Sequence, residues 1–215
     1  MSKVIVLATS KGGAGKSTLA RSLACHYYNT NCAIAVIDAD PQGSIINRHD
    51  VNGPIRDLPI FSDPEESVYG LIEEHKERYS PLLVDTGGFR NRTTVMAILM
   101  SDLVLIPLKP SSDDVAGAME TARLIHELND TPERESRPIR YKFVLTMSQK
   151  GTVIAKHVRD ELEGQNYPLL KAEMYHRVSY PESSIRGLAP NLMDPDGAAG
   201  RDVAAIVQEI NEVFK

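Results

Sequence analysis

The residues best suited to chemistry in this chain lie in the stretch ATSKGGAGKSTLA at positions 8–20. Three glycines and an alanine stand between two lysines, Lys11 and Lys16. Glycines let backbone N–H groups turn inward around phosphate oxygens, and a helix that begins directly afterwards adds the positive end of its dipole. The stretch therefore predicts a phosphate-binding loop. Its expected members are Gly12, Gly13, Ala14, Gly15, Lys16, Ser17 and Thr18.

Each polar side chain of the predicted loop has an expected task. Lys16 would reach the β- and γ-phosphates of a nucleotide, the Ser17 hydroxyl would ligate Mg²⁺, and Thr18 would contact the α-phosphate. The strict consensus for such a loop has a glycine five places before Gly15, where this chain has Ser10. The chain instead matches the variant KGGxGK[ST], which raises the question of what its first lysine, Lys11, does.

The elements that must position this loop alternate between apolar runs and helix-like segments. The predicted strands cover 3–9, 33–40, 81–86, 102–107, 140–146 and 168–174. The predicted helices cover 17–29, 63–79, 92–100, 113–129, 153–163 and 198–214. This alternation predicts an α/β fold over residues 1–215, a single domain with a mostly parallel, twisted sheet and helices on both faces. Ligands of such sheets bind at the carboxyl ends of the strands, where the motif residues of this chain fall.

Composition narrows the class of protein. The chain has 215 residues and a net charge of −5, which argues against a protein that coats nucleic acid with its whole surface. Residues 137–186 are nevertheless basic, with nine Lys or Arg against five Asp or Glu, so a local basic face is possible. No signal peptide is expected, and the sequence contains no apolar run near the roughly 20 residues of a membrane span. Its two cysteines lack metal-ligand spacing, and a cytoplasmic protein is expected.

The variant loop resembles that of the deviant Walker A ATPases, the ParA/MinD family of P-loop NTPases. In that family the first lysine of the motif crosses a dimer interface to the phosphates of the partner's ATP. The resemblance implies that Lys11 is this signature lysine and that the active unit is an ATP-sandwich homodimer. A cation delivered by a partner would offset the triphosphate charge only after two subunits close. The alternative is a solvated loop lysine.

Three carboxylates follow predicted strands. Asp38 and Asp40 end the strand 33–40 in VIDADPQGS, and side chains at i and i+2 of a strand point the same way. The pattern IDxDPQ resembles the family's switch I, which implies that Asp40 positions the attacking water and Asp38 supports the Mg²⁺ shell. DPQG is also good turn chemistry. Asp85 ends LLVDTGG, a Walker B form whose carboxylate would hold Mg²⁺ through water, although the family often has DxPP here.

Two further regions border the expected site. Residues 105–117, LIPLKPSSDDVAG, resemble the family's IPxxPSxxDxxG segment, with Asp114 as the matching aspartate. This segment is expected beside the site and at the dimer interface. The adenine has two candidate contacts, namely Thr146 with Met147 just past a strand, and Met193 in NLMDPDGAAG. Ordinary turns would explain both segments equally well.

Over nearly its whole length the chain looks most similar to the short ParA proteins of plasmid partition systems, such as ParF, which lack an N-terminal helix-turn-helix extension. The resemblance implies a Mg²⁺-dependent ATPase with ATP and Mg²⁺ as cofactors. It also implies non-specific DNA binding by the ATP dimer, nucleoid association, and release by a ParB-like, centromere-binding adaptor. The basic residues expected to contact DNA are Lys150, Lys156, Arg159, Lys171, Arg177 and Arg186.

Two alternatives stay open. A MinD-like, membrane-cycling ATPase needs a basic amphipathic helix at its C-terminus. Here the polar face of the predicted last helix is acidic, with Asp202, Glu209 and Glu212, so no membrane partner is expected. A metabolic ATP-dependent ligase of the dethiobiotin synthetase type is opposed by Lys11 and by the DADPQ segment. The cargo, whether plasmid, chromosome or protein cluster, and the identity of the adaptor are not encoded in any motif.

Overall fold

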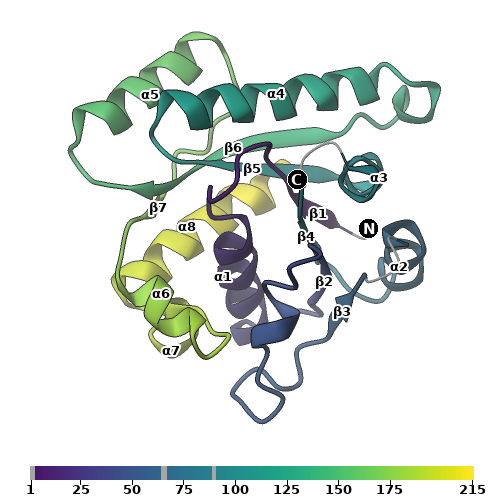
Figure 1. The fold of residues 1–215 in the computed structure, drawn as a ribbon, viewed down its shortest axis with the longest axis vertical. Coiled ribbons are helices and arrows are strands. Elements are labelled where there is room, and N and C mark those ends of the chain that lie inside the picture. Colours follow the sequence, from purple (N-terminus) through teal and green to yellow (C-terminus); the bar gives the residue numbers. More distant parts are fainter. Residues whose placement is uncertain (1–2, 64–66, 89–90) are drawn as a thin grey trace.

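A seven-stranded sheet, parallel in every pairing, organises the computed structural model, which describes residues 3–63, 67–88 and 91–215. The strand order is β3-β2-β4-β1-β5-β6-β7 (Figure 1). The strands are β1 (Val4–Leu7), β2 (Ala35–Ala39), β3 (Ile60–Ser62), β4 (Leu82–Thr86), β5 (Leu103–Leu108), β6 (Arg140–Ser148) and β7 (Met174–Tyr175). Since β1 lies between β4 and β5, the loop after β1 opens at the centre of the carboxyl edge of the sheet.

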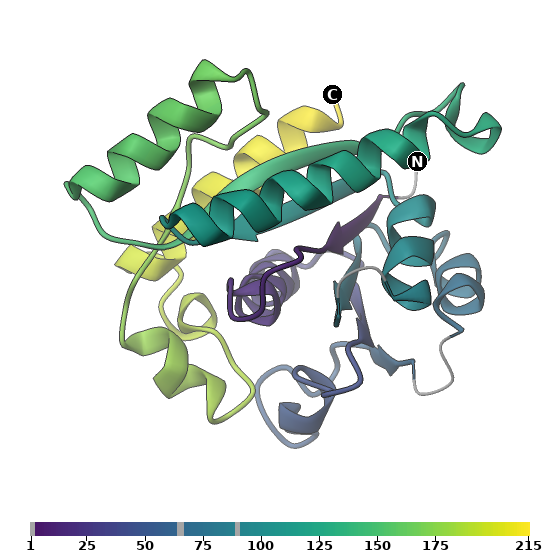
Figure 2. The same cartoon turned by 45° about the horizontal axis from the view of Figure 1, so that its top comes forward.

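Helices cover both faces of this sheet. They are α1 (Lys16–Asn29), α2 (Val68–His75), α3 (Arg92–Met100), α4 (Ser112–Asn129), α5 (Val153–Gly164), α6 (Ser179–Ser184), α7 (Pro190–Met193) and α8 (Ala198–Val213). Two short 3₁₀ turns, η1 (Ile46–Arg48) and η2 (Pro132–Arg134), complete the described elements. Figures 1 and 2 show α4 and α5 on the side of the sheet opposite α1 and α8.

The alternation of side chains along β1 explains the two layers. Ile5 and Leu7 join an apolar cluster with α1 and α8, whereas Val4 and Val6 join a second cluster with α2, α3, α4 and α5. All four residues of β1 are buried. Strands that are buried on both faces have continuous apolar sequences. The fold is predicted from this pattern. The α/β fold with helices on both faces is confirmed.

Most predicted elements match the observed ones to within a few residues. The helix predicted over 92–100 begins and ends as expected, whereas the one predicted over 63–79 is observed only as α2. Part of the predicted start of that helix, residues 64–66, lies outside the described residues. The strand β3 and the short helices α6 and α7 were not predicted, because each is only three to six residues long and carries too little periodicity to detect.

The strand predicted over 168–174 is largely wrong. Only Leu169 forms an isolated parallel bridge, with Phe143, and the strand β7 covers the two residues Met174–Tyr175. The intervening backbone N–H groups of Lys171 and Ala172 donate instead to the carboxylate of Glu209 on α8, at 2.9 and 2.7 Å. A long-range side chain therefore takes the place of the ladder that the apolar pattern predicts.

None of the described helices combines the length and apolarity that crossing a membrane requires.

Candidate functional site

The loop between β1 and α1 forms one wall of a cavity of about 470 Å³ at the carboxyl edge of the sheet. Gly13 and Gly15 have φ values of 74° and 87°, in the left-handed region that favours glycine. Gly15 is also the N-cap of α1 and offers no side-chain cap, so the first N–H groups of the helix stay available to a ligand. The cavity is lined by Thr9, Ser10, Gly12, Gly13, Gly15, Lys16, Ser17, Thr18, Asp40, Gln42, Ser44, Gly87, Gly88 and Met147.

The two lysines of the loop lie in different places. Lys16 lines the cavity, whereas Lys11 is not among the described residues that line it. The Lys11 ammonium lies 3.6 Å from the carboxylate of Asp113 on α4, with 43% of the lysine side chain exposed. Such an exposed pair contributes little stability and leaves Lys11 free to move. The geometry thus separates a lysine that faces its own cavity from one that faces outward.

Helix α4 holds the start of the phosphate loop through hydrogen bonds. The Ser10 hydroxyl donates to the carbonyl of Gly117 at 2.9 Å, and the Ser10 N–H donates to the Thr121 hydroxyl at 3.1 Å. A Cβ on Gly117 would lie 2.7 Å from the Ser10 hydroxyl, so this close approach requires glycine. Asp114, the aspartate matched to the family segment, is buried and accepts from Ser111 in the first turn of α4. Ser111 caps α4 by accepting from the Asp114 N–H at 3.2 Å, and the Asp114 carboxylate holds this cap in place.

Asp38 lies near the end of β2 and Asp40 directly follows the strand, and the two carboxylates are held differently. Asp38 is 2% exposed, and its carboxylate accepts from the N–H groups of Ile45 and Ile46 at 2.8 and 2.9 Å. Asp40 lines the cavity and accepts from the Gln42 N–H at 2.9 Å. Asp38 thus folds the turn back on the strand end, while Asp40 is presented to the cavity.

Asp85 is the most deeply buried of the three carboxylates. It pairs in register with Asp38 on the neighbouring strand and is fully buried. Neither of its carboxylate oxygens has a hydrogen-bond partner of normal geometry among the described residues. Burial raises the pKa of Asp85 to about 7; the nearby Ser17 hydroxyl and Lys16 ammonium lower it, and Asp38 and Asp40 raise it. An unpaired carboxylate beside a phosphate loop could hold a divalent cation.

Gly87, directly after β4, lies where the turns after β2 and β4 meet. A Cβ on Gly87 would lie 2.9 Å from Pro41 and 3.0 Å from the Asp40 carboxylate. The turn after β4 and the turn after β2 therefore touch directly over the cavity. No group of three or more His, Cys, Asp or Glu side chains that could hold a metal ion by itself occurs among the described residues.

The structure places the three adenine candidates differently. Thr146 is fully buried, and its hydroxyl donates to the carbonyl of Ala14 at 2.7 Å, so it supports the loop instead of facing a ligand. Met193 lies outside the cavity and lines a different hollow, beside α6 and α8. Met147, with a φ of 52°, does line the cavity. It also lines a second cavity, of about 280 Å³, which Thr18 shares.

This second cavity was missed by the sequence reasoning. Its remaining walls come from β7, α6 and the segment between them, namely Met174, Tyr175, His176, Arg177, Tyr180, Pro181 and Ser184. The Tyr180 hydroxyl is buried without a partner among the described residues. The signal that could have found it is positional, because the segment follows the last strand at the carboxyl edge.

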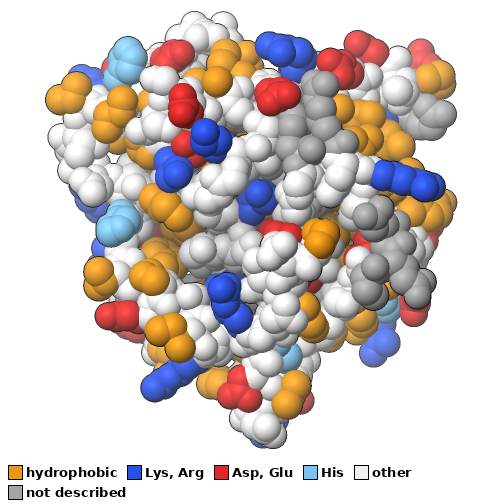
Figure 3. All heavy atoms as spheres, in the orientation of Figure 1, with side chains coloured by type: hydrophobic (Ala, Val, Ile, Leu, Met, Phe, Trp, Pro, Cys, Tyr) orange, Lys and Arg blue, Asp and Glu red, His pale blue; other side chains and the backbone are white. Residues whose placement is uncertain are grey.

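The six basic residues predicted to contact DNA differ in whether their side chains pair with acidic groups of the fold. Arg159 pairs with Glu173 at 2.7 Å, and Arg177 pairs with Asp202 at 2.7 Å, so both guanidinium groups are engaged within the fold. The others, Lys150, Lys156, Lys171 and Arg186, are exposed. Lys150, Lys156 and Arg159 line a cavity of about 360 Å³ at the start of α5. Basic and acidic side chains are mixed on the face drawn in Figure 3.

Comparison with known proteins agrees with this arrangement. Residues 5–191 match the CobQ/CobB/MinD/ParA nucleotide binding domain, and the chain belongs to this family. The ParA/MinD resemblance predicted from the loop is therefore confirmed.

Two curated relatives and one solved structure illustrate the similarity. The protein ParA of Rhizobium radiobacter is 28% identical over 94% of this chain and 90% of its own length. The maintenance of carboxysome distribution protein A of Halothiobacillus neapolitanus is 23% identical over 98% and 95%. A putative plasmid partition protein of Borrelia burgdorferi B31, solved bound to AMPPNP, shares the fold with a TM-score of 0.73, 20% identity, and 99% coverage of both chains.

Proposed function

We propose that this chain is a ParA-type, Mg²⁺-dependent ATPase that forms an ATP-sandwich dimer and binds non-specific DNA. A centromere-binding, ParB-like adaptor would stimulate hydrolysis and release the protein, which would segregate or position a DNA or protein cargo. The observation that carries the proposal is the separation of the two lysines. Lys16 faces the cavity of its own subunit, while Lys11 is half exposed beside Asp113 and available to a partner's nucleotide.

The residues at the cavity fit a magnesium nucleotide. Mg²⁺ prefers one or two carboxylates together with substrate phosphates and water, and does not need an all-protein cage. Neither buried carboxylate oxygen of Asp85 has a hydrogen-bond partner of normal geometry within the described part of the chain, and Ser17 lies beside it on the phosphate loop. We assign Mg²⁺ to Ser17 and Asp85, with Asp38 supporting it through the turn that it folds. The ion would offset the charge of the triphosphate.

The nucleotide base would occupy the second cavity. Thr18 and Met147 line both hollows, so a ligand with its phosphates on the loop can extend its base past these two residues. Mostly apolar walls with a few polar atoms are typical of base pockets. Met147 is therefore retained as an adenine contact, and the segment of β7 and α6 replaces Thr146 and Met193 in that role.

Hydrolysis would rest on Asp40 and on the lysine of the partner subunit. Asp40 lies at the cavity wall, where its carboxylate can orient a water molecule for attack on the γ-phosphate. Lys11 from the second subunit would stabilise the charge that develops in the transition state. This division explains why turnover would require the dimer, whereas binding would not.

DNA binding is the test that separates this proposal from its rivals. Fluorescence anisotropy on a non-specific duplex would compare protein without nucleotide, with ADP, and with Mg²⁺ and a slowly hydrolysed ATP analogue. We expect binding only with the ATP analogue, and a steep loss of affinity with salt, because Lys and Arg would contact phosphates. Lys150→Ala with Lys156→Ala should weaken binding and reduce the salt slope by about two units, near one for each lost phosphate contact.

The matched control removes two charges elsewhere. Arg56 and Arg78 are exposed and lie away from the cavity at the start of α5, so their double alanine variant should bind DNA like the wild type. Equal losses in both double variants would refute the assignment of this surface. An absence of DNA binding in every nucleotide state would oppose the partition role. Liposome binding would then favour a MinD-like cycle, and its absence a metabolic ligase.

A further inference from the structure

Arg21 is a buried cation in the helix that follows the phosphate loop. It is 4% exposed and lies one turn after Ser17 on α1, so the two side chains share a face of the helix. Its guanidinium Nη2 donates to the carbonyl of Ser44 at 2.8 Å, across the space between α1 and the turn after β2. Its Nε has no hydrogen-bond partner among the described residues. Arg21 thus contacts a segment that carries site residues.

The carbonyl that Arg21 holds is at the middle of the turn that presents Asp40. Ser44 itself lines the cavity. The next two N–H groups, of Ile45 and Ile46, donate to Asp38, and the N–H of Gly43 donates to the carbonyl of Asp40 at 2.8 Å. A hydrogen bond at Ser44 therefore fixes the chain between Asp40, which faces the cavity, and Ile45, whose N–H donates to Asp38.

The charge of Arg21 is placed among those of the site. Burial lowers its pKa, the neighbouring Arg48 lowers it further, and the carboxylates of Asp85 and Asp38 act in the opposite direction. A buried guanidinium with one carbonyl partner is costly, and an aliphatic side chain would fill the same space at lower cost. Packing alone therefore does not account for an arginine here, whereas its contact with the turn does.

We propose that Arg21 is a positioning residue for ATP hydrolysis, which acts by holding the Ser44 carbonyl so that the turn of residues 40–46 presents Asp40 to the cavity. The inference rests on the proposed ATPase function. It predicts that the arginine contributes to the rate of turnover more than to nucleotide affinity, because the phosphate loop does not depend on this contact.

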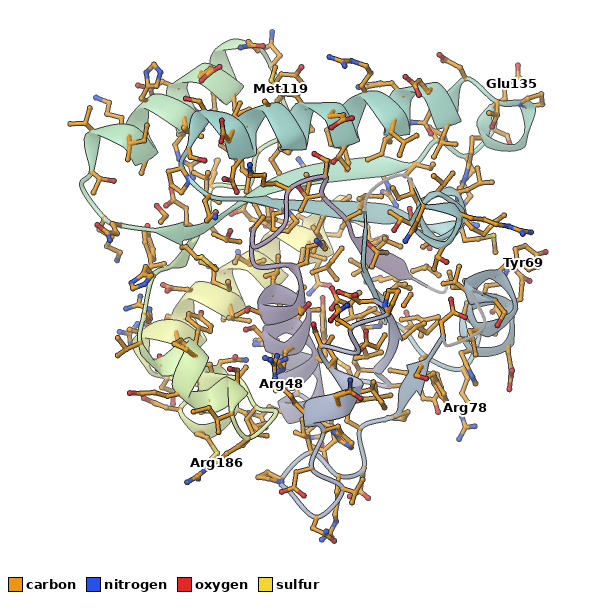
Figure 4. All side chains as sticks on the ribbon, in the orientation of Figure 1. Arg48, Tyr69, Arg78, Met119, Glu135 and Arg186 are labelled. Atoms are coloured by element: carbon orange, nitrogen blue, oxygen red, sulfur yellow. The ribbon has the colours of Figure 1, made fainter. Side chains whose placement is uncertain are left out.

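Arg48 provides a matched control, because it contacts the same carbonyl from outside. Its Nη1 lies 3.4 Å from the Ser44 oxygen, and its side chain is exposed on η1, where Figure 4 labels it. Arg21→Met and Arg48→Met remove the same functional group from the two sides of one oxygen. Arg21→Lys keeps a charge and a donor that can still reach a carbonyl.

The experiment compares kcat, KM for ATP and hydrogen exchange of the turn in the full-length chain. For Arg21→Met we expect kcat to fall about tenfold or more with KM changed less than about threefold, and the Ile45 and Ile46 amides to exchange faster. Arg21→Lys should restore part of both, and Arg48→Met should resemble the wild type. If Arg21→Met does not fold, Arg21→Lys and wild type still provide the comparison, since one ammonium cannot reproduce the guanidinium fork.

Two results would overturn the inference. One is a wild-type kcat with wild-type exchange of the turn in the Arg21 variants. The other is an equal loss in the Arg21→Met and Arg48→Met variants, which would mean that exposed charge near η1 is what matters. Failure of the proposed function looks different, because the wild-type protein would then show no ATP turnover at all.

Discussion

Replacing Asp85 by asparagine should stabilise the metal-free protein at neutral and alkaline pH. Asp85 is fully buried, has no hydrogen-bond partner of normal geometry among the described residues, and has a pKa raised to about 7 by burial. Ionisation of Asp85 is therefore unfavourable in the folded state, whereas it carries no such cost in the unfolded chain. Because an amide is neutral at every pH, the variant Asp85→Asn removes the cost of burying a charge while keeping the shape of the side chain.

The size and sign of the effect follow from the pKa. The unfolded carboxyl titrates near its model value of 3.8 and the folded one near 7. Between those values the native state binds more protons than the unfolded state, so the free energy of unfolding falls as pH rises and levels off above the folded pKa. At about 1.4 kcal/mol for each pKa unit, the full loss is about 4 kcal/mol, of which about 3 kcal/mol falls between about pH 5 and about pH 8.

The assay is chemical denaturation of wild type and Asp85→Asn in EDTA at these two pH values. The stability difference should grow by about 3 kcal/mol in favour of the variant as pH rises. Asp38→Asn is the matched control on the neighbouring strand. Because Asp38 accepts from the Ile45 and Ile46 amides, placing an NH₂ group there should cost about 1–3 kcal/mol at both pH values.

Magnesium provides the converse measurement. Mg²⁺ with ATP should raise the stability of wild type, since a ligand that binds only the native state stabilises it by mass action. The same addition should have a smaller effect on Asp85→Asn, which lacks the charged ligand. A stability difference that stays constant from about pH 5 to about pH 8 would refute the reasoning, because it would mean that Asp85 titrates alike in the folded and unfolded chain.

Three further predictions concern the loops around the site. Gly187→Ala should destabilise the protein by about 3 kcal/mol or more, since its φ is +67° and a Cβ would overlap the Arg48 carbonyl. Gly151→Ala is the control, because Gly151 has a similar φ of +76° but open space around it, and this change should cost about 1 kcal/mol. Equal costs of the two changes in thermal unfolding would disprove the contact between residue 187 and Arg48. Lys11→Ala should bind ATP as a monomer but lose ATP-dependent dimerisation in analytical ultracentrifugation, and a variant that still dimerised would remove the trans role. Asp40→Ala should bind ATP, accumulate as dimer and hydrolyse slowly, and wild-type turnover would end that assignment.

The local patterns of the sequence predicted the parts of the fold that local physics determines. Continuous apolar runs identified β1, β4 and β5, because strands of a parallel sheet are buried on both faces. The glycine pattern identified the phosphate loop, since only glycine adopts the φ values of Gly13 and Gly15 at low cost. Asp38, Asp40 and Asp85 could be placed together because parallel strands end at one edge.

The remaining features arise from contacts between distant residues. Thr146 supports the loop across 132 positions of sequence, through its bond to Ala14, and this could not be read from the turn in which it lies. Glu209 ended the predicted last strand by taking two of its amides, and Asp202 and Glu173 engaged two of the arginines expected on a DNA-binding face. Sequence periodicity reports which face of an element is buried. It does not report which polar groups meet there, because those pairings are decided only when the packed elements bring their donors and acceptors together.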